Sequence, residues 1–468
     1  MGQIQKKDRP NILFIMSDDH ASHAMSCYGS KINETPNLDR ISNEGMRFDN
    51  CFCTNAICAP SRASILTGKY NHMNGVKTLF DDFDGRQPHV AKMLQQEGYQ
   101  TAIVGKWHLG HGGVSDPTGF DYWNIFPDQG AYHDPEMIEM GKDKIFKGYA
   151  TDIVTNLSLD WLKKRNKDAP FFLMCHHKAP HRPWEPDEKH AHMYRDLNIP
   201  VPDTFNDDYS NRAYAATEAA MRIDQDLNEI DLKEKPPENL SHEALKDWKY
   251  QHFIKDYLRC IASIDDNVGL MLNYLDKEGI VENTIVIYTS DQGFFLGDHG
   301  WYDKRFMYEE SLRMPFIVRY PREIEPGSVQ ESMALNVDFA ETFLDYAGIS
   351  IPEDMQGNSL RPLMRGQTPN NWQTSMYYRY WEHLSDPHLV CAHYGLRTKK
   401  YKLVYYYGEA LGLKGTKDEP RTPEWELFDL EKDPKEMKSV YDDPDYSEAV
   451  NELKLELYHL KEELKDNE

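Results

Sequence analysis

Short, strongly apolar segments alternate with amphipathic ones through the first three quarters of this chain, and few folds accommodate that order. The apolar segments are short and rich in β-branched and aromatic residues, so we expect buried strands at 11–16, 101–104, 171–175, 284–289 and 316–319. Helices are expected near 37–45, 88–97, 151–165 and 253–278. Strand–helix–strand units make right-handed crossovers. The pattern therefore predicts an α/β fold: a large, mostly parallel central sheet flanked by helices.

The C-terminal part of the chain has a different pattern. Beyond about residue 370, segments 396–407 and 425–430 predict an antiparallel sheet, and spaced leucines after Val450 predict one amphipathic helix. We therefore expect a large domain over 1–370 and a smaller α+β subdomain over 371–468. Within the large domain, 205–250 is polar and acidic, and we interpret it as a solvated insertion with short helices.

The composition excludes several classes of protein. A net charge of −24 is incompatible with a nucleic-acid surface, and no run of 18 apolar residues predicts a membrane span. Seven cysteines are too few and too scattered for a disulfide framework. No signal peptide is visible, which predicts a cytoplasmic protein as written, or a periplasmic or secreted one if a signal peptide was trimmed.

Polar, titratable residues follow four of the predicted strands. In open α/β sheets, ligands bind beyond the carboxyl ends of the strands, so these side chains are expected at one edge of the sheet. They are Asp18 and Asp19, Lys106 and His108, the histidines 176, 177 and 181, and finally Asp291 and Gln292.

Four of these residues offer hard oxygen ligands: Asp18, Asp19, Asp291 and Gln292. Such donors suit Ca²⁺ or Mg²⁺, and the lack of a converging thiolate and imidazole set argues against zinc. His177 and His181 have the i,i+4 spacing of a zinc pair, but Pro180 disfavours the helix that this spacing requires.

The segment Cys58-Ala59-Pro60-Ser61-Arg62 is the strongest single indication of chemistry. Pro60 suits a first helical turn, and Cys58 would then lie near free amides and the positive end of the helix dipole. Arg62 would lie on the same side, one turn later. This geometry favours a reactive side chain that faces an anion. From typical composition, the pattern arises by chance in roughly one chain per thousand of this length.

Several of these segments resemble the formylglycine-dependent (type I) sulfatases of the alkaline-phosphatase superfamily. The resemblance rests on 58–68, on Gly105-Lys106-Trp107-His108-Leu109-Gly110 and on 427–434, with the motifs in the family's order. It implies a sulfatase fold and the hydrolysis of O-sulfate esters. It further implies that a maturation enzyme converts Cys58 to formylglycine, whose hydrate attacks sulfur.

The resemblance also implies a role for each residue of the site. Calcium, rather than magnesium, would be bound by Asp18, Asp19, Asp291, Gln292 and the modified residue 58. The cations Arg62, Lys106 and Lys304 would neutralise the sulfate oxygens. His181 would protonate the leaving alcohol. His108 would then take a proton from the remaining hydroxyl, so that the aldehyde re-forms and sulfate leaves.

The expected substrate is a sulfated carbohydrate. Segment 58–70 resembles glucosamine- and N-acetylglucosamine-6-sulfatases, whereas 179–184 and 303–310 resemble glycan sulfatases more broadly, including iduronate-2-sulfatases. We favour the 6-O-sulfate of N-acetylglucosamine or glucosamine in host or algal glycans, with a uronate 2-O-sulfate as the alternative. Expected sugar contacts, with the two tryptophans stacking on the rings, are Arg182, Trp184, His299 and Trp301.

Two rival functions are compatible with the same residues. Phosphate and phosphonate monoester hydrolases share the broader fold and can share the modified cysteine. Alternatively, a protein whose Cys58 is never converted would bind sulfated sugar without turnover. Every expected catalytic position is filled, which argues against the inactive form.

Overall fold

A ten-stranded sheet forms the centre of the computed structural model, which describes residues 9–468. Five adjacent strands are parallel: β9 (Thr284–Ser290), β1 (Asn11–Ser17), β8 (Phe171–His176), β4 (Gln100–Lys106) and β5 (Tyr122–Phe126). The outer strands make the sheet mixed: β12 (Phe316–Arg319), β2 (Met46–Phe48) and β13 (Ser328–Gln330) at one side, β6 (Glu136–Glu139) and β7 (Lys142–Ile145) at the other. The predicted α/β class with a large central sheet is confirmed.

One predicted strand runs against the expected direction. β12 pairs antiparallel with β9, because the chain between Ser290 and Phe316 makes no full crossover. It stays near the carboxyl end of β9 and forms only short elements: β10 (Phe295–Leu296), the 3-10 turn η6 (Asp298–Gly300), β11 (Tyr302–Asp303) and the one-turn helix α9 (Glu309–Leu312). The chain therefore re-enters the sheet from the edge at which it left.

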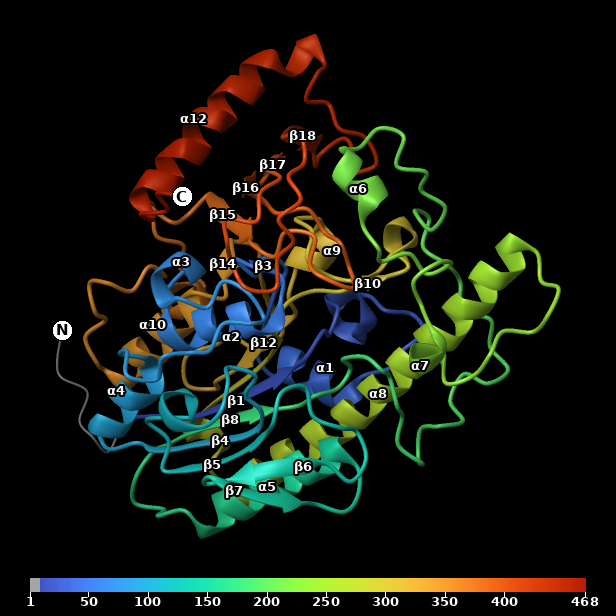
Figure 1. Cartoon of the computed structure of the whole chain (residues 1–468). Coiled ribbons are helices and arrows are strands. Elements are labelled where there is room, and N and C mark those ends of the chain that lie inside the picture. The colour runs from blue at the N-terminus through green and yellow to red at the C-terminus, as the bar shows by residue number, and fades with distance from the viewer. Residues whose placement is uncertain (1–8) are drawn as a thin grey trace.

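Helices cover both faces of the sheet, because successive residues of the central strands point to opposite sides. Ile12, Phe14 and Met16 of β1 belong to the core shared with α2 (Cys58–Thr67), α4 (Val90–Gln96) and α10 (Asp338–Ala347). Leu13 and Ile15 belong to the core shared with α1 (Pro36–Asn43), α5 (Ala150–Lys164) and α8 (His242–Glu278). Figure 1 shows the sheet between these two layers.

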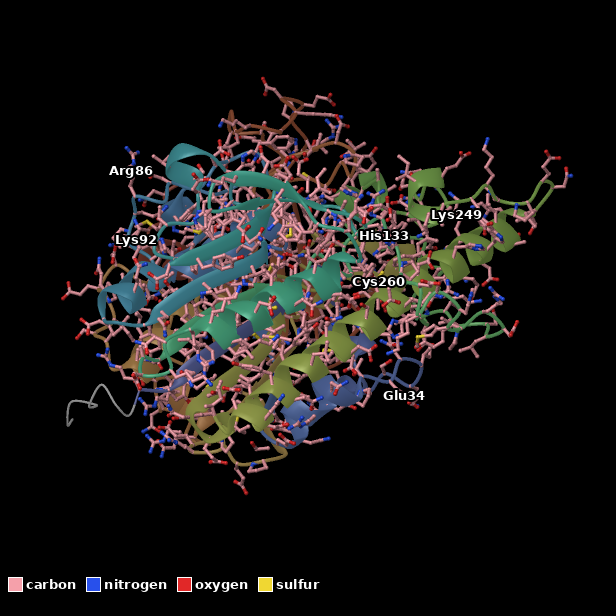
Figure 2. All side chains as sticks on the ribbon, turned by 90° about the horizontal axis from the view of Figure 1, so that it is seen from below. Glu34, Arg86, Lys92, His133, Lys249 and Cys260 are labelled. Atoms are coloured by element: carbon pink, nitrogen blue, oxygen red, sulfur yellow. The ribbon has the colours of Figure 1, made fainter. Side chains whose placement is uncertain are left out.

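The helix α8 is longer than predicted, because it begins at His242 rather than near 253. Ser241 caps it, with the Ser241 side chain accepting a hydrogen bond from the amide of Ala244. In the view from below, Cys260 lies where α8 packs beside α5, and Lys249 lies toward its projecting N-terminal half (Figure 2). None of the helices in residues 9–468 combines the length and apolarity that crossing a membrane requires.

The C-terminal part forms a separate four-stranded antiparallel sheet, as predicted. It consists of β15 (Ser375–Tyr380), β16 (His393–Thr398), β17 (Tyr401–Tyr406) and β18 (Glu424–Asp429), with α12 (Ser447–Glu463) packed against it. Figure 1 shows α12 lying across these strands at the outside of the molecule.

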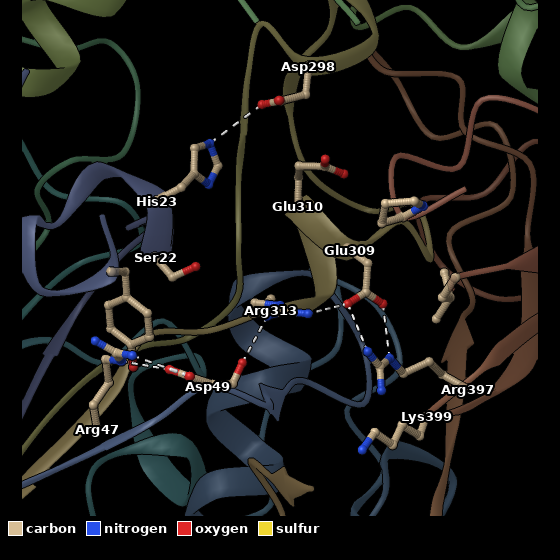
Figure 3. Close-up of a pocket in the computed structure, with 13 residues that line it drawn as sticks. Ser22, His23, Arg47, Asp49, Asp298, Glu309, Glu310, Arg313, Arg397 and Lys399 are labelled. Atoms are coloured by element: carbon tan, nitrogen blue, oxygen red, sulfur yellow. Dashed lines mark hydrogen bonds and ion pairs between the residues drawn. The ribbon is translucent and has the colours of Figure 1, made fainter. Parts of the chain in front are cut away.

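A network of ion pairs joins this sheet to the large domain. Glu309 of α9 accepts hydrogen bonds from Arg397 of β16 at 3.0 and 3.1 Å and from Arg313 at 2.7 Å, and it lies 3.0 Å from the Lys402 ammonium. The network lines a cavity of about 630 Å³ between the two parts (Figure 3). Because Glu309 is largely buried and pairs with three cations, it fixes one part of the chain against the other.

Only part of the acidic segment 205–250 is the solvated excursion that we expected: residues 233–244 are almost all exposed, whereas other parts are buried. It contains the short helices α6 (Tyr214–Glu218) and α7 (Glu229–Leu232), and two of its acids are buried against loops beyond the sheet edge. Asp207 pairs with His299 at 2.8 Å, and Asp231 pairs with Arg182 at 2.6 Å. These two pairs explain how so acidic a segment packs against the large domain.

Candidate active site

The register of four neighbouring strands brings the predicted site residues together. Ser17 of β1 lies opposite Ser290 of β9, so Asp18 and Asp291 leave the sheet side by side. The other neighbour of β1 is β8, which pairs in turn with β4. These two strands end at the same level, because Gly105 of β4 lies opposite His176 of β8. At Gly105 (φ +103°) the two backbones approach so closely that a Cβ would collide with the His176 carbonyl. Lys106 and the His176–His181 loop therefore emerge beside the two aspartates.

Three carboxylates converge at this edge. Asp18, Asp19 and Asp291 each place an oxygen within 4.8 Å of the others, and all three are fully buried. Asp19 has a left-handed backbone (φ 68°), which turns its side chain back toward the strand ends. Gln292 lies against them, and its amide nitrogen donates a hydrogen bond to Asp19. The grouping predicted from the sequence is thus present in space.

The residues of this cluster fit a hard dication. Asp18 Oδ1 and Gln292 Oε1 are both buried without a hydrogen-bond partner among the described residues, although buried oxygens are normally satisfied. Carboxylate and amide oxygens are the ligands that Ca²⁺ prefers. A cation bound by these oxygens would satisfy both orphaned atoms.

The pKa values show how crowded these acids are. Burial raises the pKa of Asp19 to about 7, and the neighbouring Asp18 and Asp291 add to the effect against Lys304. Burial, with help from Asp18, also raises the pKa of Asp291 to about 6. Burial likewise disfavours ionised Asp18, but Lys106 and the other nearby cations hold the pKa of that carboxyl well below its usual range.

Each carboxylate also faces one cation. Lys106 pairs with Asp18, Lys304 lies 2.6 Å from each oxygen of Asp19, and Arg62 lies 2.9 Å from Asp291. With the acids ionised, these formal charges cancel. A bound dication would leave an excess of positive charge, which favours an anionic ligand even in a protein whose net charge is −24.

Cys58 is the first residue of α2, and its side chain points into this cluster. Its sulfur lies within 4.8 Å of a carboxylate oxygen of Asp18 and of a ring nitrogen of His181. Burial raises the pKa of the Cys58 thiol, although Lys106 opposes this. The start of α2 therefore does not lower the pKa of the unmodified thiol, and the reactive, anion-facing role of residue 58 stays a prediction.

The two predicted proton-transfer histidines lie on different sides of the cluster. At His181, Nδ1 donates a hydrogen bond of 2.7 Å to the Arg182 carbonyl, and Nε2 lies 3.8 Å from Asp19. His108 has a left-handed backbone (φ 54°), and its Nε2 lies 3.3 Å from the amide nitrogen of Gln129. Burial lowers the pKa of both rings well below the ordinary histidine value, so both are neutral without a ligand.

The two tryptophans are not sugar platforms, contrary to our expectation. Trp184 is fully buried, with its ring 4.5 Å from Phe253. Trp301 is also fully buried, stacked on Tyr209 at 5.2 Å and on Phe306 at 5.0 Å. Each fills the core beneath the site loops, and neither ring face is open to a ligand.

The other two expected sugar contacts are held by acids of the 205–250 segment. His299 is fully buried against Asp207, so it supports a loop rather than facing a substrate. Arg182 forms a bidentate ion pair with Asp231 and is partly exposed. Its contact with sugar remains a prediction.

Sequence reasoning missed three polar residues beside the catalytic set. Gln129 contacts both Lys106 and His108. Asp303 and Arg305 flank Lys304 with left-handed backbones, φ 78° and 91°, an unusual geometry for charged residues. The sequence does not reveal backbone angles, so this geometry on both sides of Lys304 could not be predicted from it.

A buried acid cluster, a cysteine at a helix start and two lysines meet at one sheet edge, an arrangement suited to an enzyme that hydrolyses an anionic ester. The chain belongs to the sulfatase family: the Sulfatase family model matches residues 10–349, and the model described as "N-sulphoglucosamine sulphohydrolase, C-terminal" matches residues 297–463.

Individual relatives cover nearly the whole chain. An N-acetylglucosamine-6-O-sulfatase of Bacteroides thetaiotaomicron is 43% identical over 511 residues, covering 100% of this chain and 88% of that protein. An arylsulfatase of Clostridium perfringens is 29% identical, covering 95% of this chain and 93% of that protein. A solved structure of a protein in complex with its substrate D-glucosamine-2-N,6-O-disulfate is 43% identical, with a TM-score of 0.92 over 98% of this chain and 99% of that one.

Proposed function

We propose that this sulfatase removes the 6-O-sulfate of N-acetylglucosamine or glucosamine residues in glycans, using a formylglycine derived from Cys58 and a bound calcium ion. The observation that carries the substrate is the full-length likeness, at 43% identity, to an N-acetylglucosamine-6-O-sulfatase. A TM-score of 0.92 to a protein solved with a 6-O-sulfated glucosamine supports the same substrate class.

The arrangement of this chain's own residues supports the chemistry. Asp18, Asp19, Asp291 and Gln292 would hold the ion, and hydrated formylglycine at residue 58 would supply the attacking oxygen. A dication there would lower the pKa of that hydroxyl, so that its proton is lost to solvent before attack, and would neutralise negative charge on the sulfate. Because Lys106 and Lys304 now pair with the carboxylates that would bind the ion, calcium binding would free their ammonium groups for sulfate oxygens.

The two histidines divide the proton transfers. Nδ1 of His181 is committed to the Arg182 carbonyl, so only Nε2 can deliver a proton, and this atom faces the acid cluster. Bound sulfate, as a neighbouring anion, would favour the doubly protonated ring. When the bond between sulfur and the sugar oxygen breaks, the proton on Nε2 of His181 passes to that oxygen and the alcohol leaves. His108 accepts the proton of the residual hydroxyl on residue 58 as sulfate departs.

The experiment is to measure sulfate release from a defined panel, with the protein co-expressed with a formylglycine-generating enzyme. The panel contains N-acetylglucosamine-6-sulfate, glucosamine-2-N,6-O-disulfate, a uronate 2-O-sulfate disaccharide, an aryl sulfate and an aryl phosphate. We expect the two 6-sulfates to be the preferred saccharides and Cys58→Ala to abolish turnover. Preference for the uronate sulfate or the aryl phosphate would replace the proposal by a rival, and binding without turnover by a converted protein would refute it.

A further inference from the structure

Gln129 connects two residues of the proposed catalytic set. Its carbonyl oxygen Oε1 accepts a hydrogen bond from the Lys106 ammonium, and its amide nitrogen Nε2 lies 3.3 Å from Nε2 of His108. β5 pairs with β4 so that Phe126 lies opposite Lys106, and this register places the residues just after β5 beside Lys106 and His108.

The turn that carries Gln129 is tightly built. Asp128 before it has a left-handed backbone (φ 50°), and Gly130 after it has φ 70°. A Cβ at Gly130 would lie only 2.7 Å from the Phe126 ring, so this residue must be glycine for the turn to close on β5. The side chain between them is therefore held toward the site.

The chemistry of the partners fixes which way the amide points. An ammonium group can only donate hydrogen bonds, so the Gln129 oxygen must face Lys106 and the NH₂ group must face His108. An NH₂ group can only donate, so Nε2 of His108 must accept. In the neutral ring the proton then lies on Nδ1, which is buried without a partner among residues 9–468.

We propose that Gln129 is a positioning residue that uses Lys106 as its anchor to hold His108 in the tautomer with an unprotonated Nε2, whose electron pair accepts the Gln129 hydrogen bond until the residual hydroxyl of residue 58 takes its place. This inference rests on the proposed function, in which His108 accepts a proton after sulfur transfer. Without Gln129, nothing in the described chain selects between the two ring tautomers, and Lys106 loses its neutral partner.

Two substitutions separate this role from a merely structural one. Gln129→Glu keeps an oxygen for Lys106 but replaces the donor facing His108 by an acceptor, so His108 must carry a proton on Nε2. Gln129→Ala removes both contacts. Asp128→Asn is the matched control, since it alters an exposed residue of the same turn and asparagine tolerates the left-handed conformation.

The test combines ¹⁵N NMR of histidine-labelled protein with kinetics on an aryl sulfate. The His108 signals are assigned from a His108→Gln spectrum. We expect Nε2 of His108 to show the shift of an unprotonated nitrogen in the wild type and in Asp128→Asn, and that of a protonated nitrogen in Gln129→Glu. We expect kcat to fall about 10- to 100-fold in both Gln129 variants, with KM changing much less.

The proposal is overturned if Gln129→Glu keeps the wild-type His108 shifts, or if either Gln129 variant keeps the wild-type kcat. The NMR arm needs no turnover and the kinetic arm needs no glycan. Failure of the wild type on glucosamine 6-sulfates would therefore contradict the proposed substrate and leave this test intact.

Discussion

Calcium should stabilise this protein more strongly as the pH rises, because the ion replaces protons on the buried carboxyls. Without the ion, Asp19 and Asp291 have pKa values of about 7 and about 6 in the folded protein. In the unfolded chain both return to about 3.9. Between about pH 4 and pH 7 the metal-free folded state thus binds more protons than the unfolded state, and the stability due to these groups falls as the pH rises.

The magnitude follows from the same two values. Each pKa unit corresponds to about 1.4 kcal/mol, so by about pH 7 the two groups destabilise the metal-free fold by up to about 7 kcal/mol relative to about pH 4. Asp18 does not change this pH range. Because its pKa is lowered in the folded protein, the stability that its carboxylate contributes is fully present above about pH 4 and is lost only at lower pH. In the proposed site, calcium would bind the ionised acids and recover most of the lost stability.

The assay is chemical unfolding at a series of pH values, with calcium or with a chelator at equal ionic strength. Buried neutral histidines such as His108 and His181 also make stability depend on pH, but they are present in both conditions and largely cancel in the difference. We expect the calcium-dependent stabilisation to grow steadily from about pH 4.5 to about pH 7. Parallel curves, with a stabilisation that does not change with pH, would refute the assignment of these acids as the ion's ligands.

Three further substitutions test other parts of the account. His181→Ala should lower kcat on a sugar sulfate by about 10²- to 10⁴-fold but much less on an aryl sulfate, whose acidic leaving group needs no proton; equal losses would argue against the assigned role. Glu309→Ala should destabilise the fold by about 3–5 kcal/mol, seen as an earlier unfolding transition, because it leaves Arg397 and Arg313 without their shared carboxylate. It should leave kcat unchanged. Trp301→Ala should cost about 3–5 kcal/mol of stability and leave KM for the sugar sulfate unchanged in the folded fraction, whereas a selective rise in KM would restore the stacking role.

The centre of the fold was predictable because the four strands β9, β1, β8 and β4 are apolar runs buried on both faces. The edge elements were not: β7 (Lys142–Ile145) is exposed along its length and mostly charged, so it carries no strand pattern. The start of α8 did leave a signal, because Ser241 stands three residues before Ala244 as an N-cap. The first turns of α8, from His242 to about residue 248, are mostly polar and project from the core. They lack the apolar stripe from which we predicted the rest of this helix.

The acid cluster was predictable for a related reason. Parallel strands end together, so residues that follow them in the sequence must meet in space. Gln129 was missed because β5 was not recognised as a strand, and a glutamine after an unrecognised strand attracts no notice. The aromatic residues show the opposite failure. Trp184 and Trp301 stand beside catalytic motifs, but proximity in sequence does not distinguish a side chain that lines a site from one that supports it from beneath.

The most direct test of the account is the mass of the tryptic peptide that runs from Phe48 to Arg62, taken from active protein after thiol alkylation. This peptide holds three cysteines, Cys51, Cys53 and Cys58. We predict that residues 51 and 53 are alkylated and that residue 58 has the mass of formylglycine and takes up no alkylating agent. An active enzyme in which Cys58 is alkylated as an ordinary cysteine would contradict the nucleophile on which the mechanism depends.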